Sequence, residues 1–329
     1  MPAFLLSSFL KNQSSVAIGL SGGPDSLALT HMLSQICATE NLSTKIHALI
    51  VNHNLRPEAA EEAKDVQRIA ANFPNTCPAI LTWETPQQNA RIMETARNAR
   101  YELMTAYCKQ HHIKYLYIAH HQDDQAETFL FRLAKGSGLD GLCGMQEELQ
   151  YADDLTILRP LLDKPKSELM SYCQEYALPF LNDPSNQKEE YARPRLRKSR
   201  EILEQEGLSS RRLALTAKRL SRAKDALVWL SQQAWDNTVT TTGQAIRINL
   251  DALSNYPEEI HFRVIKSAVL SMTPDRDYAP RMEKLEEIAT QLFTELPFRK
   301  QTFAKLIFEN RIKNGTAILV IEKECTNPA

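Results

Sequence analysis

The sequence lacks closely spaced cysteines, although it contains six of them. They stand at positions 37, 77, 108, 143, 173 and 325 and form no Cys-x-x-Cys pair. A structural zinc ion or an iron–sulfur cluster needs ligands at short spacing, so the cysteine pattern argues against both. Single, scattered cysteines are typical of thiols in a reducing compartment, and we therefore expect a cytoplasmic protein.

Long apolar runs and basic leader signals are also missing. No run reaches the roughly 18 consecutive apolar residues that a membrane-spanning helix needs, so we expect no membrane association. The apolar start MPAFLLSSFL has no basic residue before it and no small-residue cleavage site. These features predict a packed helix there and not a signal peptide.

The chain has almost no overall excess of charge, because its formal net charge is −1. The charge is nevertheless uneven. Residues 193–224 hold eleven Lys or Arg against three Glu, a net charge of +8, which leaves −9 for the rest of the chain. Such an asymmetry favours a nucleic-acid-binding surface. A solvated helix surface is the alternative that this composition leaves open.

Apolar runs alternate with helical patterns in the first half of the sequence. Helical segments of ten or more residues between such runs are typical of βαβ units and a parallel sheet. Right-handed crossovers place helices on both faces of that sheet. The predicted strands are residues 14–20, 44–53, 79–83, 115–120 and 156–162, and the predicted helices are residues 27–38, 61–73, 89–110 and 124–135.

The sequence changes character after LPFLNDPSNQ, which ends at residue 187. Charged helical segments follow, and then one predicted strand over residues 240–250, two further helices and a hairpin around Asn314 and Gly315. We therefore expect an α/β domain with an open parallel sheet over residues 1–205. A smaller, mostly helical α+β domain is expected over residues 206–329.

The stretch SGGPDS lies between the first predicted strand and the helix that follows it. A glycine-rich loop at this place binds phosphate through backbone N–H groups and the positive end of the helix. The loop has no lysine and is therefore not a Walker A motif. We predict that phosphate groups bind to the residues Ser21, Gly22, Gly23, Pro24, Asp25 and Ser26.

Asp25 needs an explanation of its own, since a carboxylate repels phosphate unless a cation lies between them. Magnesium is held by one or two carboxylates together with substrate phosphates. We therefore predict that Asp25 is a magnesium ligand. The alternative is an ordinary turn in which Asp25 or Ser26 caps the following helix.

A second group of polar residues follows the strand predicted over residues 115–120. His120 ends this strand at the same sheet edge as the glycine-rich loop, and Asp124 begins the next helix. With Asp123 and Glu127 they form a cluster suited to acid–base work or metal binding. The alternative is a capped helix with a solvated acidic end.

Two arginines on one predicted helix are a further candidate. Arg97 and Arg100 are three residues apart and share a helix face. Paired guanidinium groups suit phosphate or a developing negative charge. Surface salt bridges explain the same spacing equally well.

Several motifs resemble known families. The loop SGGPDS is similar to the S-G-G-x-D-S loop of the PP-loop ATP pyrophosphatases, a Rossmann-like fold. Within that group the chain resembles the tRNA(Ile)-lysidine synthetases over about residues 16–200. The motifs that carry this resemblance are VNHNLRPEA, ETARNARYELM, AHHQDDQAETFLFRLAKGSGLDGLCGM, and NDPSN followed by RPRLR.

The resemblance implies a two-step reaction on tRNA(Ile) with a CAU anticodon. ATP adenylates the C2 oxygen of the wobble cytidine, and the ε-amine of L-lysine then displaces AMP. The resemblance also implies a C-terminal domain that binds tRNA, and it leaves a homodimer open. It implies ATP binding by Ser21–Ser26, Mg²⁺ at Asp25 and Asp124, and catalytic roles for Asp25, Arg97, His120, Asp124 and Arg193.

Three positions depart from the family pattern. Asn52 stands in place of an aspartate, Asn54 in place of a glycine, and Pro194 in place of an asparagine. Asparagine tolerates a left-handed backbone, so the turn at Asn54 is expected to survive. Two other functions stay open: a tRNA thiolase of the same superfamily, which the missing Cys-x-x-Cys disfavours, and a silent RNA-binding protein, which the intact loop disfavours.

Overall fold

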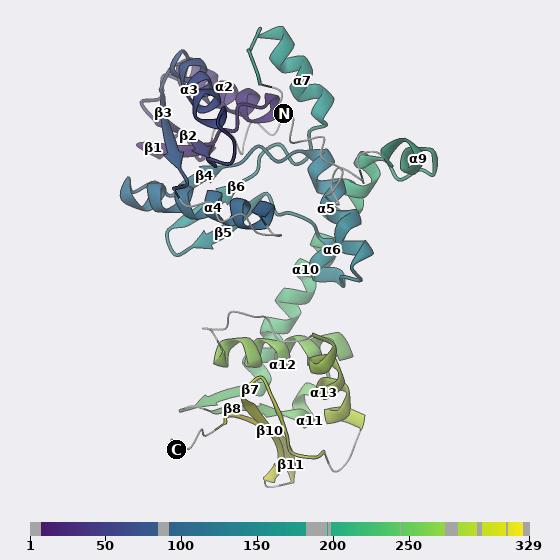
Figure 1. The fold of residues 1–329 in the computed structure, drawn as a ribbon. Helices are drawn as coiled ribbons and strands as arrows, with labels where there is room; N and C mark the ends of the chain where they lie inside the picture. Colours follow the sequence, from purple (N-terminus) through teal and green to yellow (C-terminus); the bar gives the residue numbers. More distant parts are fainter. Residues whose placement is uncertain are drawn as a thin grey trace. The chain divides into compact units, whose positions relative to one another are not determined.

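The computed structural model describes residues 8–84, 92–181, 196, 199–243, 245–273, 282–294, 298–313 and 315–324 (Figure 1). The chain divides into two compact units, Met1–Ser221 and Arg222–Ala329. The division falls inside helix α10 (Ser210–Thr238). The domain boundary expected at residue 205 lies before it and stays a prediction. In the part of the chain that is described, every helix is too short or too polar to span a membrane.

The first unit is built on a six-stranded sheet in the order β3-β2-β1-β4-β6-β5. The first five strands of this order run parallel, and β5 pairs antiparallel with β6 at the edge. The open, mostly parallel sheet is confirmed; the edge strand β5 was not predicted. The strands are β1 (Ser15–Gly19), β2 (Lys45–Asn52), β3 (Thr76–Thr82), β4 (Tyr115–Tyr117), β5 (Glu148–Ala152) and β6 (Leu155–Leu158).

Helices cover both faces of this sheet, as the apolar strands require. Val16 and Ile18 of β1 point into a core shared with α2 (Pro24–Thr39), α3 (Ala59–Ala71) and α7 (Lys166–Glu175). Ala17 points to the opposite face, into a core with Met104 of α4 (Ile92–Gln110). Figure 1 shows α2 and α3 on one side of the strands and α4 on the other.

A smaller apolar cluster joins α5 (Gln122–Ala134) to the first turns of α10. Ala126 and Phe129 of α5 pack with Leu213 and Ala217 of α10. The start of α10 therefore belongs to the same compact unit as the sheet. Two short helices, α6 (Leu139–Leu142) and α9 (Arg200–Gln205), complete this part of the unit.

The second unit is an antiparallel sheet with helices and its own apolar core. The single strand predicted over residues 240–250 is wrong, because the segment forms two paired strands, and the chain turns at Gly243, whose φ is +60°. The C-terminal hairpin is confirmed. The elements are β7 (Val239–Thr242), β8 (Ala245–Asn249), α11 (Leu250–Leu253), α12 (Glu258–Met272), α13 (Met282–Thr294), β9 (Gln301–Phe303), β10 (Leu306–Lys313) and β11 (Thr316–Lys323).

Candidate active site

The glycine-rich loop joins the end of β1 to the start of α2. Gly22 has a φ of +80°, and a Cβ at this position would lie 2.4 Å from Cγ2 of Val66, so only glycine fits. The hydroxyl oxygen of Ser26 accepts a hydrogen bond from the backbone N–H of Ser21 at 3.1 Å. It also donates to the carbonyl of Gly23 at 3.1 Å. These contacts hold the loop around the N-terminus of α2, which Pro24 begins.

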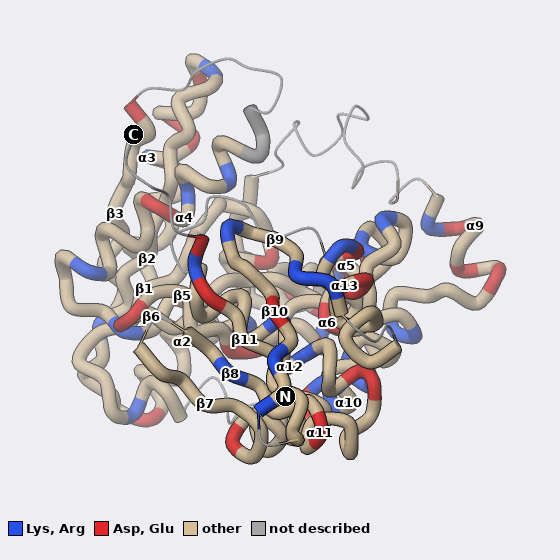
Figure 2. Tube along the Cα trace, turned by 90° about the horizontal axis from the view of Figure 1, so that it is seen from below, with Lys and Arg blue, Asp and Glu red and all other residues tan. Residues whose placement is uncertain are grey.

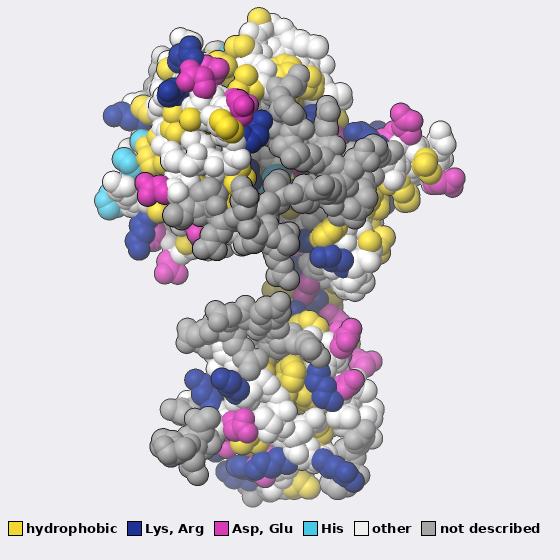
Figure 3. Space-filling view, viewed as in Figure 1, with side chains coloured by type: hydrophobic (Ala, Val, Ile, Leu, Met, Phe, Trp, Pro, Cys, Tyr) yellow, Lys and Arg dark blue, Asp and Glu magenta, His cyan; other side chains and the backbone are white. Residues whose placement is uncertain are grey.

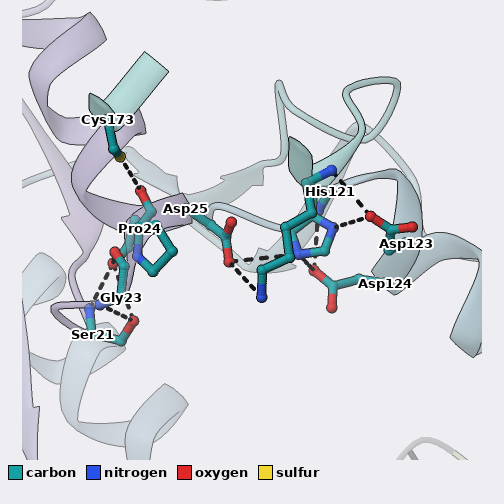
Figure 4. A network of polar contacts seen from close by, with 10 residues as sticks. Ser21, Gly23, Pro24, Asp25, His121, Asp123, Asp124 and Cys173 are labelled. Atoms are coloured by element: carbon teal, nitrogen blue, oxygen red, sulfur yellow. Dashed lines mark hydrogen bonds and ion pairs between the residues drawn. The ribbon is translucent and has the colours of Figure 1, made fainter. Parts of the chain in front are cut away.

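Asp25 lies in the first turn of α2 and reaches across to the next βα loop of the sheet (Figure 4). Its Oδ2 atom is 3.5 Å from Nε2 of His121 and 4.0 Å from Nζ of Lys166. Its Oδ1 atom is buried and has no hydrogen-bond partner among the described residues. One carboxylate oxygen is thus held by cationic side chains, and the other can act as a ligand.

His121 is the centre of the polar network. Its side chain is almost completely buried, and its Nε2 atom is also 3.4 Å from Oδ2 of Asp124. Its Nδ1 atom lies 3.8 Å from Oδ2 of Asp123. Burial disfavours a charge on this ring, but the hydrogen bond to Asp25 and the nearby carboxylates outweigh burial and raise the pKa of His121.

The two adjacent aspartates take different roles. Oδ2 of Asp124 accepts a hydrogen bond from the backbone N–H of His121 at 3.1 Å, so Asp124 helps to cap its own helix. Oδ2 of Asp123 accepts from the backbone N–H of Lys166 at 3.0 Å, and its Oδ1 lies 2.9 Å from a guanidinium nitrogen of Arg200. Burial raises the pKa of Asp123, but hydrogen bonds to Ser210 and Lys166 and the charge of Arg200 lower it overall.

A cavity of about 240 Å³ adjoins this network. His121, Asp123, Glu127, Lys166 and Arg200 supply its charged or polar walls. The apolar part of the lining comes from α5, α9, α10 and the segments beside them: Ala126, Leu130, Leu196, Leu203, Leu208 and Leu213. A flexible chain that ends in a charged group would find both kinds of contact here.

His120 and Arg97 make contacts of their own in the described part of the chain. Nδ1 of His120 accepts a hydrogen bond from Nε of Arg159 at 3.2 Å. Arg97 is exposed on α4, with its guanidinium carbon 5.7 Å from the ring centre of Tyr101. No ion pair within the described ranges joins Arg97 to Asp25. Arg193 and Pro194 lie outside the described residues.

Asn52 and Asn54 form a tight turn after β2. The φ of Asn54 is +52°, which explains how asparagine serves where the family pattern has glycine. The side-chain oxygen of Asn52 accepts a hydrogen bond from the backbone N–H of Asn54 at 2.9 Å. Asn52 is buried, so a neutral amide holds this turn in place of a carboxylate.

The donor set around Asp25 fits a magnesium ion that arrives with a nucleotide. The unpartnered Oδ1 of Asp25 is the kind of hard oxygen ligand that magnesium prefers. Among the described residues no three His, Cys, Asp or Glu side chains form a metal cluster. Magnesium needs no such cluster, because it takes most of its ligands from water and substrate phosphates.

The basic segment of α10 is exposed to solvent. The side chains of Arg211, Arg212, Lys218 and Arg222 are all exposed, and Figure 2 marks such charges along the trace. Lys218 lies 3.8 Å from Glu147, so one of these charges is partly balanced. On the face that Figure 3 shows, Lys and Arg side chains of the described residues lie among Asp and Glu side chains.

Comparisons with known proteins identify the family of the chain. A family model described as a PP-loop domain matches residues 3–205. The chain is 36% identical over 287 residues to a tRNA(Ile)-lysidine synthase of Wolbachia pipientis wMel. It is 36% identical over 275 residues to the Methylobacterium nodulans protein of that name, covering 83% of this chain and 79% of that protein. The chain belongs to the tRNA(Ile)-lysidine synthase family.

The share of each relative's length that this chain matches differs among members of the lysidine synthase family. The match to the Wolbachia protein covers 87% of this chain but only 65% of that protein. The match to the Rhodopseudomonas palustris protein covers 95% of this chain and 90% of that protein, at 32% identity. Among solved structures, the U34-tRNA thiolase NcsA from Methanococcus maripaludis with its [4Fe-4S] cluster is 18% identical, with a TM-score of 0.54. That match covers 67% of this chain and 76% of the thiolase chain and supports the fold alone.

Sequence reasoning did not select three residues of this candidate site. His121 was passed over for His120, although a histidine directly before the QDDQ helix start stands at an N-cap position. Lys166 begins α7 and faces Asp25, a contact with no local signal in the sequence. Arg159 had a signal, because it is the one charged residue in the apolar run TILRPLL at the end of a predicted strand.

Proposed function

We propose that this protein is a tRNA(Ile)-lysidine synthetase that uses ATP, magnesium and L-lysine on tRNA(Ile) with a CAU anticodon. Its family membership supports this proposal. The observation that carries it is the contact of Asp25, in the phosphate loop, with His121 at the start of α5. This contact supports the proposal because it joins acidic and basic groups to the loop that we propose binds the phosphates. We propose the cytoplasm as the location, which the scattered cysteines support.

The proposed reaction has two steps. The C2 oxygen of the wobble cytidine attacks the α-phosphorus of ATP, and pyrophosphate leaves with the electron pair of the broken P–O bond. The ε-amine of lysine then attacks C2, AMP leaves with the former C2 oxygen, and the amine loses a proton. Backbone N–H groups of Ser21, Gly22 and Gly23 bind the phosphates.

Magnesium would neutralise charge on the phosphates, and Asp25 and Asp124 would hold it. Lys166 supplies positive charge beside Asp25, and the raised pKa of His121 favours a positive charge on its ring as well. His120, Arg97 and Arg193 are proposed to act on the transferring α-phosphate. Because His121 is buried between carboxylates, it orients them and limits the access of water to the site.

The cavity beside His121 is the proposed site for lysine. The methylene groups of lysine would pack on its leucine side chains. The carboxylates of Asp123 and Glu127 would attract the ammonium charge. The exposed cations of α10 and the unit Arg222–Ala329 are proposed to hold the tRNA backbone.

Product analysis tests the proposal most directly. The full chain is incubated with a tRNA(Ile) CAU transcript, ATP and lysine, and the nucleosides are analysed by mass spectrometry. We expect lysidine in place of one cytidine, with AMP and pyrophosphate formed in equal amounts. A thiolated nucleoside would identify a thiolase. Binding of tRNA without any conversion of ATP would identify a silent RNA-binding protein.

A further inference from the structure

Arg159 is a buried cation at the catalytic edge of the sheet. It directly follows β6, and its exposed fraction is 7%. Its Nε donates to Nδ1 of His120 at 3.2 Å, and its Nη1 donates to the carbonyl of Gln146 at 3.0 Å. No Asp or Glu within the described ranges forms an ion pair with it. A buried charge without a carboxylate partner is costly, so this arrangement needs a reason.

The hydrogen bond to Arg159 decides where His120 carries its proton. A guanidinium group only donates hydrogen bonds and keeps its charge at neutral pH, so Nδ1 of His120 must accept. An accepting Nδ1 has no proton, and the ring is therefore neutral with its proton on Nε2. A protonated His120 ring would carry an N–H group at Nδ1, where it would face the N–H donor of Arg159. It would also bring a second positive charge next to the guanidinium group. Because Nε2 of His120 carries the proton, it acts as the donor in any hydrogen bond that it makes.

The neighbouring histidine has the opposite surroundings. Nε2 of His121 faces the carboxylates of Asp25 and Asp124, whereas Nδ1 of His120 faces a cation. The two rings follow β4, which pairs directly with β1, the strand that leads into the phosphate loop. His120 therefore presents a neutral N–H group at the edge where the phosphates of a nucleotide would bind.

We infer that Arg159 is a positioning residue that holds His120 as a neutral hydrogen-bond donor to the phosphate in transfer. This inference rests on the proposed adenylation step. When the C2 oxygen attacks the α-phosphorus and the bond to pyrophosphate breaks, negative charge develops on the phosphate oxygens. His120 stabilises this charge through Nε2–H and transfers no proton. The proton that the lysine amine loses goes to a different acceptor.

The tautomer is measured directly on the full chain. Two-bond ¹H–¹⁵N spectra of imidazole rings at neutral pH distinguish the two tautomers and the charged form, and His120→Gln identifies the His120 signals. We expect the wild type to show a proton on Nε2 and a bare Nδ1. In Arg159→Met we expect this preference to be lost, while the signals of His31 stay in place. A proton on Nδ1 in the wild type overturns the inference, even if Arg159→Met fails to fold.

The kinetic test separates a donor from a base. Glutamine at position 120 keeps an N–H donor near the place of Nε2 but cannot take up a proton. We expect His120→Gln to slow pyrophosphate release by about tenfold, and His120→Ala to slow it by about 100- to 1000-fold. Equal losses in both variants contradict the donor role. The spectra need no substrate, so a wild type that makes no lysidine would refute the proposed function and leave the tautomer result standing.

Discussion

Nε2 of His121 lies 3.5 Å from Oδ2 of Asp25, and this contact joins the N-terminus of α5 to the phosphate loop at the start of α2. The two residues follow neighbouring parallel strands, β4 and β1, whose carboxyl ends lie at one edge of the sheet. His121 is buried, so removal of either partner leaves a buried polar group without its counterpart. The first two predictions concern this edge.

Asp25→Asn should raise the magnesium concentration needed for half-maximal pyrophosphate release and lower the maximal rate by about 10- to 100-fold. The amide has nearly the same shape but no charge with which to hold a cation. The measurement is pyrophosphate release in a magnesium titration. Asp65→Asn, on the exposed surface of α3, is the matched control and should behave as wild type. If the dependence of pyrophosphate release on magnesium is unchanged in Asp25→Asn, Asp25 is not a magnesium ligand.

Gly22→Ala should weaken ATP binding and lower the free energy of unfolding, whereas Gly23→Ala should preserve stability. At Gly22 the left-handed backbone alone costs about 1–2 kcal/mol with a side chain present, and the new Cβ would lie 2.4 Å from Val66. At Gly23 the nearest atom to a new Cβ is 3.6 Å away, and the backbone is extended. Thermal unfolding of both variants is the measurement. Equal losses of stability would contradict the argument.

The contribution of His31 to the stability of the first unit should fall as the pH drops below about 6.5. His31 is buried between α2 and α7, where its Nδ1 lies 2.8 Å from the hydroxyl of Tyr172, and burial lowers its pKa. The unfolded chain therefore takes up a proton at a higher pH than the folded chain does. The contribution of His31 is complete above the unfolded pKa and is lost as the pH falls toward the folded pKa.

Urea unfolding of wild type and His31→Gln at several pH values tests this contribution. The difference in unfolding free energy between the two proteins should change with pH by at most about 1.4 kcal/mol per pH unit, since one proton is involved. His112→Gln, on an exposed turn, serves as control and should track the wild type. A difference between wild type and His31→Gln that is independent of pH would show that His31 does not titrate in this range.

Changing Arg211, Arg212, Lys218 and Arg222 together to Gln should weaken tRNA binding and flatten its salt dependence. Each lost phosphate contact should reduce the slope by at most about 0.7–0.9. The affinity for ATP without tRNA should stay unchanged, because these side chains are exposed on α10 and none contacts Asp25 or His121 in the described structure. A variant with Lys at all four positions keeps the charge and should keep the slope. Identical slopes in the Gln variant and wild type would mean that the segment is only a solvated helix surface.

The sequence by itself determined the strand–loop–helix at residues 15–39 and the mostly parallel sheet. Local signals suffice there: apolar runs make buried strands, and glycine at position 22 permits a left-handed turn. It placed Asp25 in the turn before a helix over residues 27–38, whereas α2 begins at Pro24 and includes Asp25 in its first turn. Strand β5 escaped prediction, because three of its five residues are exposed and it has no apolar run.

Only the tertiary structure decided which of the adjacent polar residues enter the site. His120 and His121 are neighbours in the short segment between the end of β4 at Tyr117 and the start of α5 at Gln122, but their rings face Arg159 and Asp25 respectively. The side chains of Asp123 and Asp124 also contact different partners, because Asp123 accepts a hydrogen bond from the backbone of Lys166 and Asp124 accepts one from the backbone of His121. Such contacts join residues far apart in sequence, and their geometry depends on how each strand end meets the next helix, which a residue pattern does not encode.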